Sequence, residues 1–84
     1  MSRGSTDGAQ GAIRTLLAER AEGATLCPSE AARLMAGTGG DWRGVMPHVH
    51  RAAAELLNGG AIALSWKGRP LDAPVGPYRI GRAD

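Results

Sequence analysis

The sequence predicts a mostly helical α+β domain, with three helices followed by a C-terminal β-hairpin. Three stretches place apolar residues at helical spacing, and each stretch ends at a glycine. After the third stretch the apolar period changes from 3.6 to two residues, which is typical of a half-buried strand. A chain of 84 residues has room for one such domain, but not for a deep substrate cavity beside its core.

The first helix is predicted from about Gly8 to Glu22. Asp7 is expected to cap its N-terminus, because Gln10 follows three residues later in the spacing of a capping box. The apolar stripe of this helix consists of Ile13, Leu16, Leu17 and Ala21. Gly23 can then take the left-handed conformation that commonly ends a helix, and a short extended segment follows at 24–26.

The second helix is predicted to begin at Pro28, since the missing amide of proline has no intrahelical partner at that position anyway. Glu30 lies in the first turn, where a carboxylate favours the positive end of the helix dipole. Gly37 is expected to end the helix. The residues expected on its inner face are Ala31, Leu34 and Met35.

The third helix is predicted from Trp42 to about Asn58, after a flexible turn at 37–40. Asp41 is expected to cap it, and Gly59-Gly60 to close it. Pro47 interrupts the pattern, so it either kinks this helix or marks the start of its regular part. The residues expected on its inner side are Trp42, Val45, Met46, Val49, Ala53 and Leu56.

The remaining residues predict a hairpin. Ile62, Leu64 and Trp66 alternate with small residues, a turn is expected at 67–70, a loop at 71–77, and the returning strand at 78–80. The resulting order is helix, short strand, helix, helix, strand, wing, strand. This is the order of a winged helix-turn-helix, with the third helix in the position that recognises DNA.

The predicted domain covers residues 7–81, with a disordered leader at 1–6 and a frayed tail at 82–84. Its core is expected to contain Ile13, Leu16, Leu17, Leu34, Val49, Leu56, Ile62 and Leu64.

Several short motifs resemble a known family. They are Leu26-Cys27-Pro28-Ser29-Glu30-Ala31-Ala32-Arg33, Asp41-Trp42-Arg43, Met46-Pro47 and Lys67-Gly68-Arg69-Pro70. In combination they resemble a small bacterial winged-helix family that is described as a domain of unknown function, over roughly residues 11–80. The resemblance implies a winged helix and no reaction. The turn at 37–40 is longer than is usual for that family.

Positive charge gathers in the second half of the chain. The net charge is only +2, but residues 42–84 hold six of the ten basic residues and three of the eight acidic ones. This asymmetry favours an anionic partner that meets the C-terminal half, although a solvated surface with chance clustering gives the same count.

The third helix carries the first candidate site, on the side opposite its apolar stripe. That side holds Arg43, Pro47, Arg51, Ala54 and Asn58, with His48 and Glu55 beside it and His50 near its edge. Arg43 and Arg51 can reach guanine edges or phosphates in a major groove, and His48 lies next to them. The alternative is an ordinary solvated helix face.

The turn at 67–70 carries the second candidate site, through Lys67 and Arg69. Its Gly-Arg-Pro sequence resembles short hooks that bind the minor groove, where a narrow groove concentrates negative potential and attracts an extended arginine. The alternative is that glycine and proline are there only as turn residues.

No metal, cofactor or catalytic site is expected. His48 and His50 are two residues apart, so on a helix they point to different faces, and Cys27 has no second cysteine nearby. The glycine-rich turn at 37–40 lacks the Lys-Ser/Thr of a phosphate loop, and no paired-carboxylate or nucleophile motif occurs. The sequence therefore predicts a protein that is not an enzyme.

The function favoured by these patterns is a small binding module for duplex DNA that uses the third helix and the wing, with a role related to transcription. The alternative is a protein–protein interaction module without nucleic-acid binding, and the oligomeric state stays open. A single cysteine, no apolar signal segment and no membrane-length apolar run predict a cytoplasmic protein. The preference for Ala, Gly and Arg over Lys indicates a GC-rich, bacterial genome.

Overall fold

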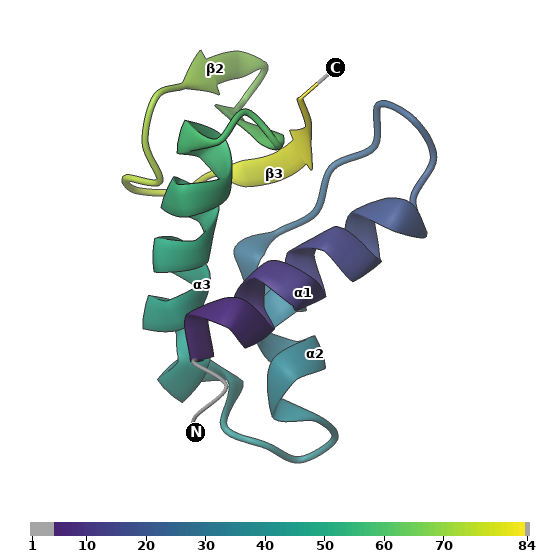
Figure 1. The fold of residues 1–84 in the computed structure, drawn as a ribbon, viewed down its shortest axis with the longest axis vertical. Helices are drawn as coiled ribbons and strands as arrows, with labels where there is room; N and C mark the ends of the chain where they lie inside the picture. The colour runs from purple at the N-terminus through teal and green to yellow at the C-terminus, as the bar shows by residue number, and fades with distance from the viewer. Residues whose placement is uncertain (1–4, 84) are drawn as a thin grey trace.

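The computed structural model describes residues 5–83, as three helices and a three-stranded antiparallel sheet (Figure 1). The helices are α1 (Ser5–Ala18), α2 (Pro28–Ala36) and α3 (Trp42–Asn58), and the strands are β1 (Ile62–Trp66), β2 (Arg69–Leu71) and β3 (Arg79–Arg82). This confirms the predicted α+β winged helix-turn-helix. Within residues 5–83, no helix is both long enough and apolar enough to cross a membrane.

Helix α1 begins and ends earlier than predicted. Ser5 and Thr6, which were predicted to belong to the leader, are helical. Asp7 therefore lies in the first turn and does not cap the helix. The rest of the predicted leader, residues 1–4, lies outside the described residues. The helix ends at Ala18, where hydrogen bonds between residues three apart replace those between residues four apart. The Arg20 amide donates to the Leu17 carbonyl at 3.1 Å.

Helices α2 and α3 have the predicted bounds, because their ends are set by local signals. The Asp41 side chain accepts a hydrogen bond from the Gly44 amide at 3.1 Å, as expected of an N-cap. Pro47 is the sixth residue of α3, so it lies inside the helix and does not start it.

The inner face of α2 differs from the prediction at one position. Ala31 and Ala32 are fully buried, whereas Leu34 is 48% exposed and does not belong to the core. Leu34 follows Ala32 by two residues, which is about 200° around a helix, so only one of the two can face α1 and α3.

The sheet has the order β2-β1-β3, which corrects the predicted hairpin. Residues 69–71, expected in a turn and loop, form β2, and β3 pairs with the other edge of β1, with Leu64 opposite Ile80. Leu26 joins β3 from outside through two backbone hydrogen bonds to Ile80, both of 2.8 Å. Arg82, assigned to the frayed tail, is the last residue of β3, while Asp84 lies outside the described residues.

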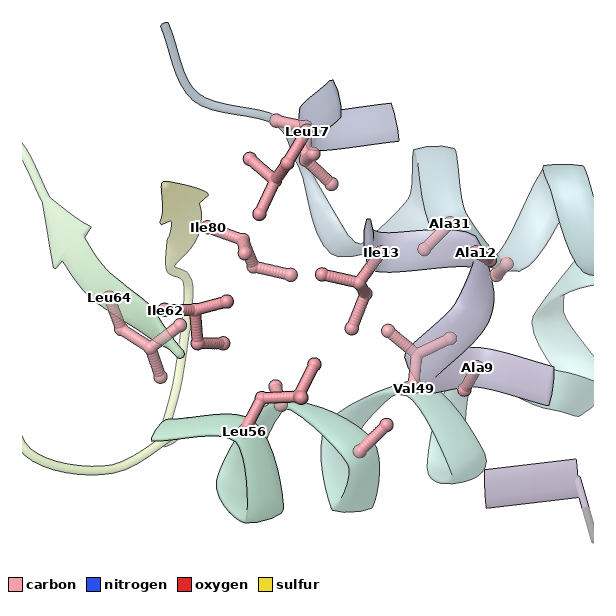
Figure 2. Packing of buried hydrophobic residues seen from close by; sticks show 14 of the residues in the cluster. Ala9, Ala12, Ile13, Leu17, Ala31, Val49, Leu56, Ile62, Leu64 and Ile80 are labelled. Atoms are coloured by element: carbon pink, nitrogen blue, oxygen red, sulfur yellow. The ribbon is translucent and has the colours of Figure 1, made fainter. Parts of the chain in front are cut away.

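The core lies between α1, α3 and the sheet, which meets α3 near the C-terminal end of that helix (Figures 1 and 2). Its largest fully buried side chains are Ile13, Leu26, Leu64, Ile80 and Val49. Leu17, Leu56 and Ile62 are also buried as predicted, and Leu16 packs against them half-buried. Six buried alanines let the helices approach closely: Ala9, Ala12, Ala31, Ala32, Ala52 and Ala53.

Candidate nucleic-acid interface

The outer face of α3 is formed by residues spaced four apart. Arg43, Pro47 and Arg51 follow one another at this interval, and all three are exposed. Neither arginine forms a hydrogen bond or an ion pair with another side chain in residues 5–83. The predicted basic face is therefore present, and its two guanidinium groups have no carboxylate partner in that part of the chain.

Arg43 is oriented by the neighbouring indole. The Cζ atom of Arg43 lies 4.4 Å from the centroid of the Trp42 ring, and the Cζ atom of Arg33, from α2, lies 4.6 Å from the same centroid. Both distances are those of cation–π contacts. Sequence reasoning placed Trp42 only on the apolar stripe and gave Arg33 no role; the adjacent Trp-Arg pair was the one local signal.

The turn between α2 and α3, which leads directly into Trp42, requires glycine at particular positions. A Cβ atom on Gly40 would lie 2.2 Å from the Ala36 carbonyl oxygen, so no other residue fits there without moving the backbone. Gly37 and Gly39 have φ angles of 76° and 77°, which L side chains rarely adopt. The sequence therefore sets the path of this turn.

The two histidines of α3 have different surroundings. His48, a predicted DNA contact, is half-buried. The Nδ1 atom of His50 is 2.7 Å from the Tyr78 hydroxyl, so His50 faces the chain leading into β3. Burial raises the pKa of Tyr78 to about 12. In residues 5–83 no three His, Cys, Asp or Glu side chains gather in one place, and the absence of a metal stays a prediction.

The wing consists of a two-residue turn and an edge strand. Lys67 and Gly68 have φ angles of 52° and 81°, and Trp66 pairs directly with Arg69 across them. Positive φ at both turn residues is typical of a type I′ hairpin. Lys67 and Arg69 are exposed, and Arg69 and Pro70 belong to the edge strand β2. Minor-groove binding by this Gly-Arg-Pro sequence stays a prediction.

The base of the wing lies beside the middle of α3. Trp66, at the end of β1, lines the same surface hollow as Met46 and His50, with a volume of about 280 Å³. Cys27, the residue before α2, lines the same hollow. The helix and the wing therefore occupy neighbouring parts of the surface.

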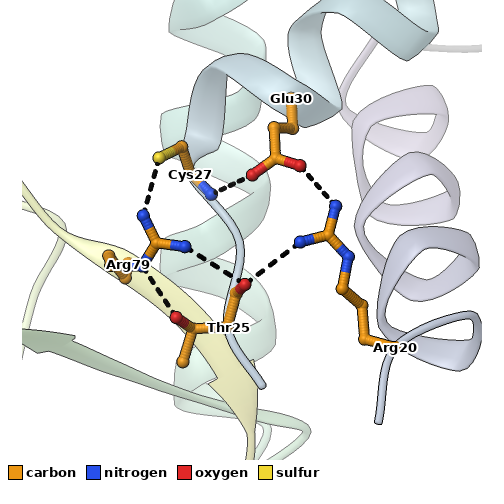
Figure 3. A network of polar contacts seen from close by, with 5 residues as sticks. All are labelled: Arg20, Thr25, Cys27, Glu30 and Arg79. Carbon is orange, nitrogen blue, oxygen red and sulfur yellow. Dashed lines mark hydrogen bonds and ion pairs between the residues drawn. The ribbon is translucent and has the colours of Figure 1, made fainter.

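Arg79, counted among the C-terminal basic residues, is bound inside the domain (Figure 3). Its guanidinium group donates to the Thr25 Oγ1 atom at 2.7 Å, to the Cys27 Sγ atom at 2.9 Å and to the Thr25 carbonyl at 3.2 Å. These bonds hold the strand-like segment before α2 against β3. The Sγ atom of Cys27 therefore takes part in a contact that supports the fold.

Glu30 and Arg20 complete this network. The Glu30 carboxylate accepts from the Cys27 amide at 2.8 Å and forms an ion pair with Arg20. The Cys27 amide, followed by the guanidinium of Arg20 and the charge of Arg79, holds the pKa of Glu30 below its usual value against the opposing effect of partial burial.

Arg82 is a second structural arginine. It donates to the Leu17 carbonyl at 2.7 Å and to the Arg20 carbonyl at 3.1 Å, and so satisfies carbonyls at the end of α1. Two of the six basic residues in the C-terminal half thus serve the fold. The four that form no hydrogen bond or ion pair within residues 5–83 are Arg43, Arg51, Lys67 and Arg69.

Comparison with known proteins places the chain in a family. No curated protein matches it. The model of the family described as "Protein of unknown function (DUF3253)" matches residues 7–83, which is nearly the whole chain and slightly more than the predicted range of about 11–80. The chain therefore belongs to the DUF3253 family.

Proposed function

We propose that this domain binds duplex DNA through the outer face of α3 and the β1–β2 turn, and that it is a binding module rather than an enzyme. The observation that carries the proposal is the set of four exposed basic side chains on these two elements, none of which has a carboxylate partner in residues 5–83. Phosphates supply the missing negative charge.

In this proposal α3 enters the major groove. Arg43 and Arg51 lie on one side of the helix, where their guanidinium groups reach guanine edges or phosphates. His48 adds a contact to the backbone beside them. Lys67 and Arg69 meet the phosphates that flank the groove, because both side chains extend from the two-residue turn and its edge strand.

A transcriptional role fits a domain that recognises duplex DNA. The second candidate function is docking to another protein, and exposed apolar side chains favour it. Leu34 is 48% exposed and Val75 is 75% exposed, although neither lies on the basic face of α3. A partner that used these side chains would not require the four basic residues.

The two functions are separated by titrating labelled mixed-sequence duplex with the protein at several salt concentrations, with fluorescence anisotropy as the readout. If four phosphate contacts form, log K should fall against log salt with a slope of about −3.6. The triple variant Arg43→Ala, Arg51→Ala, Arg69→Ala should lose most of the affinity. The matched control is Arg14→Ala, since Arg14 is exposed on α1 beside Ala61 and Arg82.

Two results contradict the proposal. One is the absence of duplex binding by the parent protein at about 50 mM salt, where electrostatic binding is strong. The other is a triple variant that binds as tightly as the parent. Either result favours docking to a protein, which should then be weakened by changes at Leu34 or Val75.

A further inference from the structure

The indole of Trp42 holds two guanidinium groups that come from different helices. Arg33 lies in the last turn of α2 and Arg43 in the first turn of α3, and their Cζ atoms are 4.6 and 4.4 Å from one ring centroid. Each arginine loses conformational freedom by lying on the ring. The arrangement therefore presents two ordered cations at the junction of α2 and α3.

Neither arginine forms an ion pair with a carboxylate in residues 5–83. The one ion pair there is Arg20–Glu30, and Asp41, which precedes Trp42, accepts its hydrogen bond from the Gly44 amide. Because both Cζ atoms lie near one centroid, they are no more than about 9 Å apart. Two like charges within this distance repel each other, and an anionic partner reduces that repulsion.

The surroundings leave room for the anion. Arg33, Leu34 and Trp42 line an open hollow of about 550 Å³ together with the Gly37–Gly40 turn. Three of the four turn residues have no side chain, so a ligand can approach the backbone closely. On a DNA strand one phosphate occurs about every 3.4 Å along the axis, so two cations within about 9 Å of each other can each meet a phosphate of one strand.

We propose that Arg33 and Arg43, held by Trp42, bind the phosphate backbone of the duplex. The inference rests on the proposed function and extends its interface from α3 and the wing to the end of α2. Arginine suits this role because its planar donors match phosphate oxygens in pairs. Trp42 is a positioning residue, and the contact fixes the orientation of α3 without reading a base.

The first test compares Arg33→Gln with Arg14→Gln, which removes the same charge from an exposed position on α1. In duplex titrations at several salt concentrations, Arg33→Gln should weaken binding several-fold and flatten the log–log salt slope by about 0.9, equally for different sequences. Arg14→Gln should leave the slope unchanged. If Arg33→Gln binds duplex as the parent does while Arg51→Gln binds more weakly, the inference is wrong and the proposed function stands.

The second test asks whether Trp42 acts through the arginines. Trp42→Leu should weaken duplex binding in the parent protein, but should have little further effect when Arg33→Gln and Arg43→Gln are both present. Trp42→Phe, which keeps an aromatic ring, should retain most of the affinity. An equal loss from Trp42→Leu in both backgrounds would mean a merely structural role; thermal unfolding of each variant verifies that it is folded.

The third test distinguishes duplex DNA from free phosphate as the ligand of this site. In a Trp66→Phe background Trp42 is the only tryptophan, so its fluorescence reports on the site during titration with inorganic phosphate or with duplex. A duplex response that Arg33→Gln weakens supports the inference. A response to inorganic phosphate with no duplex binding by the parent overturns both the duplex assignment and the proposed function, and leaves a site for a free phosphate.

Discussion

The imidazole of His50 and the hydroxyl of Tyr78 connect α3 to the start of β3. The Nδ1 atom lies 2.7 Å from the hydroxyl oxygen, and the ring centroids are 5.6 Å apart at an interplanar angle of 58°. Tyr78 is 3% exposed, so its hydroxyl needs this partner. The contact fixes the helix against the strand that follows the wing.

The ionisation of Tyr78 gives a first prediction. Because burial raises its pKa to about 12 from 10.0, the folded state keeps its proton at pH values where the unfolded chain loses it. The contribution of Tyr78 to the free energy of unfolding is fully present below about pH 10. It is lost as the pH rises toward about 12, by an amount on the order of 3 kcal/mol. Urea titrations across this range should show the loss in the parent and much less of it in Tyr78→Phe.

A direct measurement of that pKa is also possible, since Tyr78 is the only tyrosine. The phenolate absorbance of the folded protein should rise near pH 12, and in denaturant near pH 10. A folded-state midpoint close to 10 would contradict the burial of the hydroxyl.

The network around Glu30 predicts weakened stability in acid. The pKa of Glu30 is lowered in the folded state, so its contribution is present above the ordinary value of 4.5 and is lost as the pH falls below it. Glu30→Gln should therefore destabilise the domain at neutral pH, and the difference from the parent should shrink in acid. Glu22→Gln, at an exposed position after α1, is the control and should show neither effect.

Two leucines with different burial test the packing. Leu56 is 4% exposed, so Leu56→Ala should cost about 2–5 kcal/mol of unfolding free energy. Leu34 is 48% exposed, and Leu34→Ala should cost less than about 0.5 kcal/mol. Equal losses in a urea titration would mean that the face of α2 is wrongly assigned.

The wing turn allows folding and binding to be changed in opposite directions. Lys67 has a φ of 52°, a conformation that asparagine tolerates better than lysine, and Asn-Gly is a preferred type I′ pair. Lys67→Asn should stabilise the domain by about 0.5–1 kcal/mol and flatten the salt slope of duplex binding by about 0.9. A variant that is more stable but binds duplex like the parent would remove Lys67 from the interface.

The helix bounds that could be predicted from the sequence are those with local signals. Pro28, Gly37 and Asp41 act on their own or adjacent turns, so the limits of α2 and α3 were correct. The start of α1 was wrong because Asp7 and Gln10 have the spacing of a cap but lie inside the helix.

The features that could not be predicted depend on contacts between distant residues. Pro70 cannot donate to a ladder, which indicated a turn, yet it is accepted in β2 because that strand is an edge. Arg79 is 54 residues from Thr25, so its structural role could not be distinguished from that of a free cation. The basic face of α3 followed from periodicity, but the approach of Arg33 to Trp42 depends on the path of the Gly37–Gly40 turn.

The position of β3 has a consequence for synthesis. In space β3 lies between Leu26 and β1, yet it is the last of the described elements to leave the ribosome. Until it emerges, β1 lacks its β3 neighbour, the end of α1 lacks Arg82, and the segment before α2 lacks Arg79. The domain therefore completes its fold only after residues 79–82 have been released from the exit tunnel, and shortened nascent chains that stop before Arg79 should stay sensitive to protease.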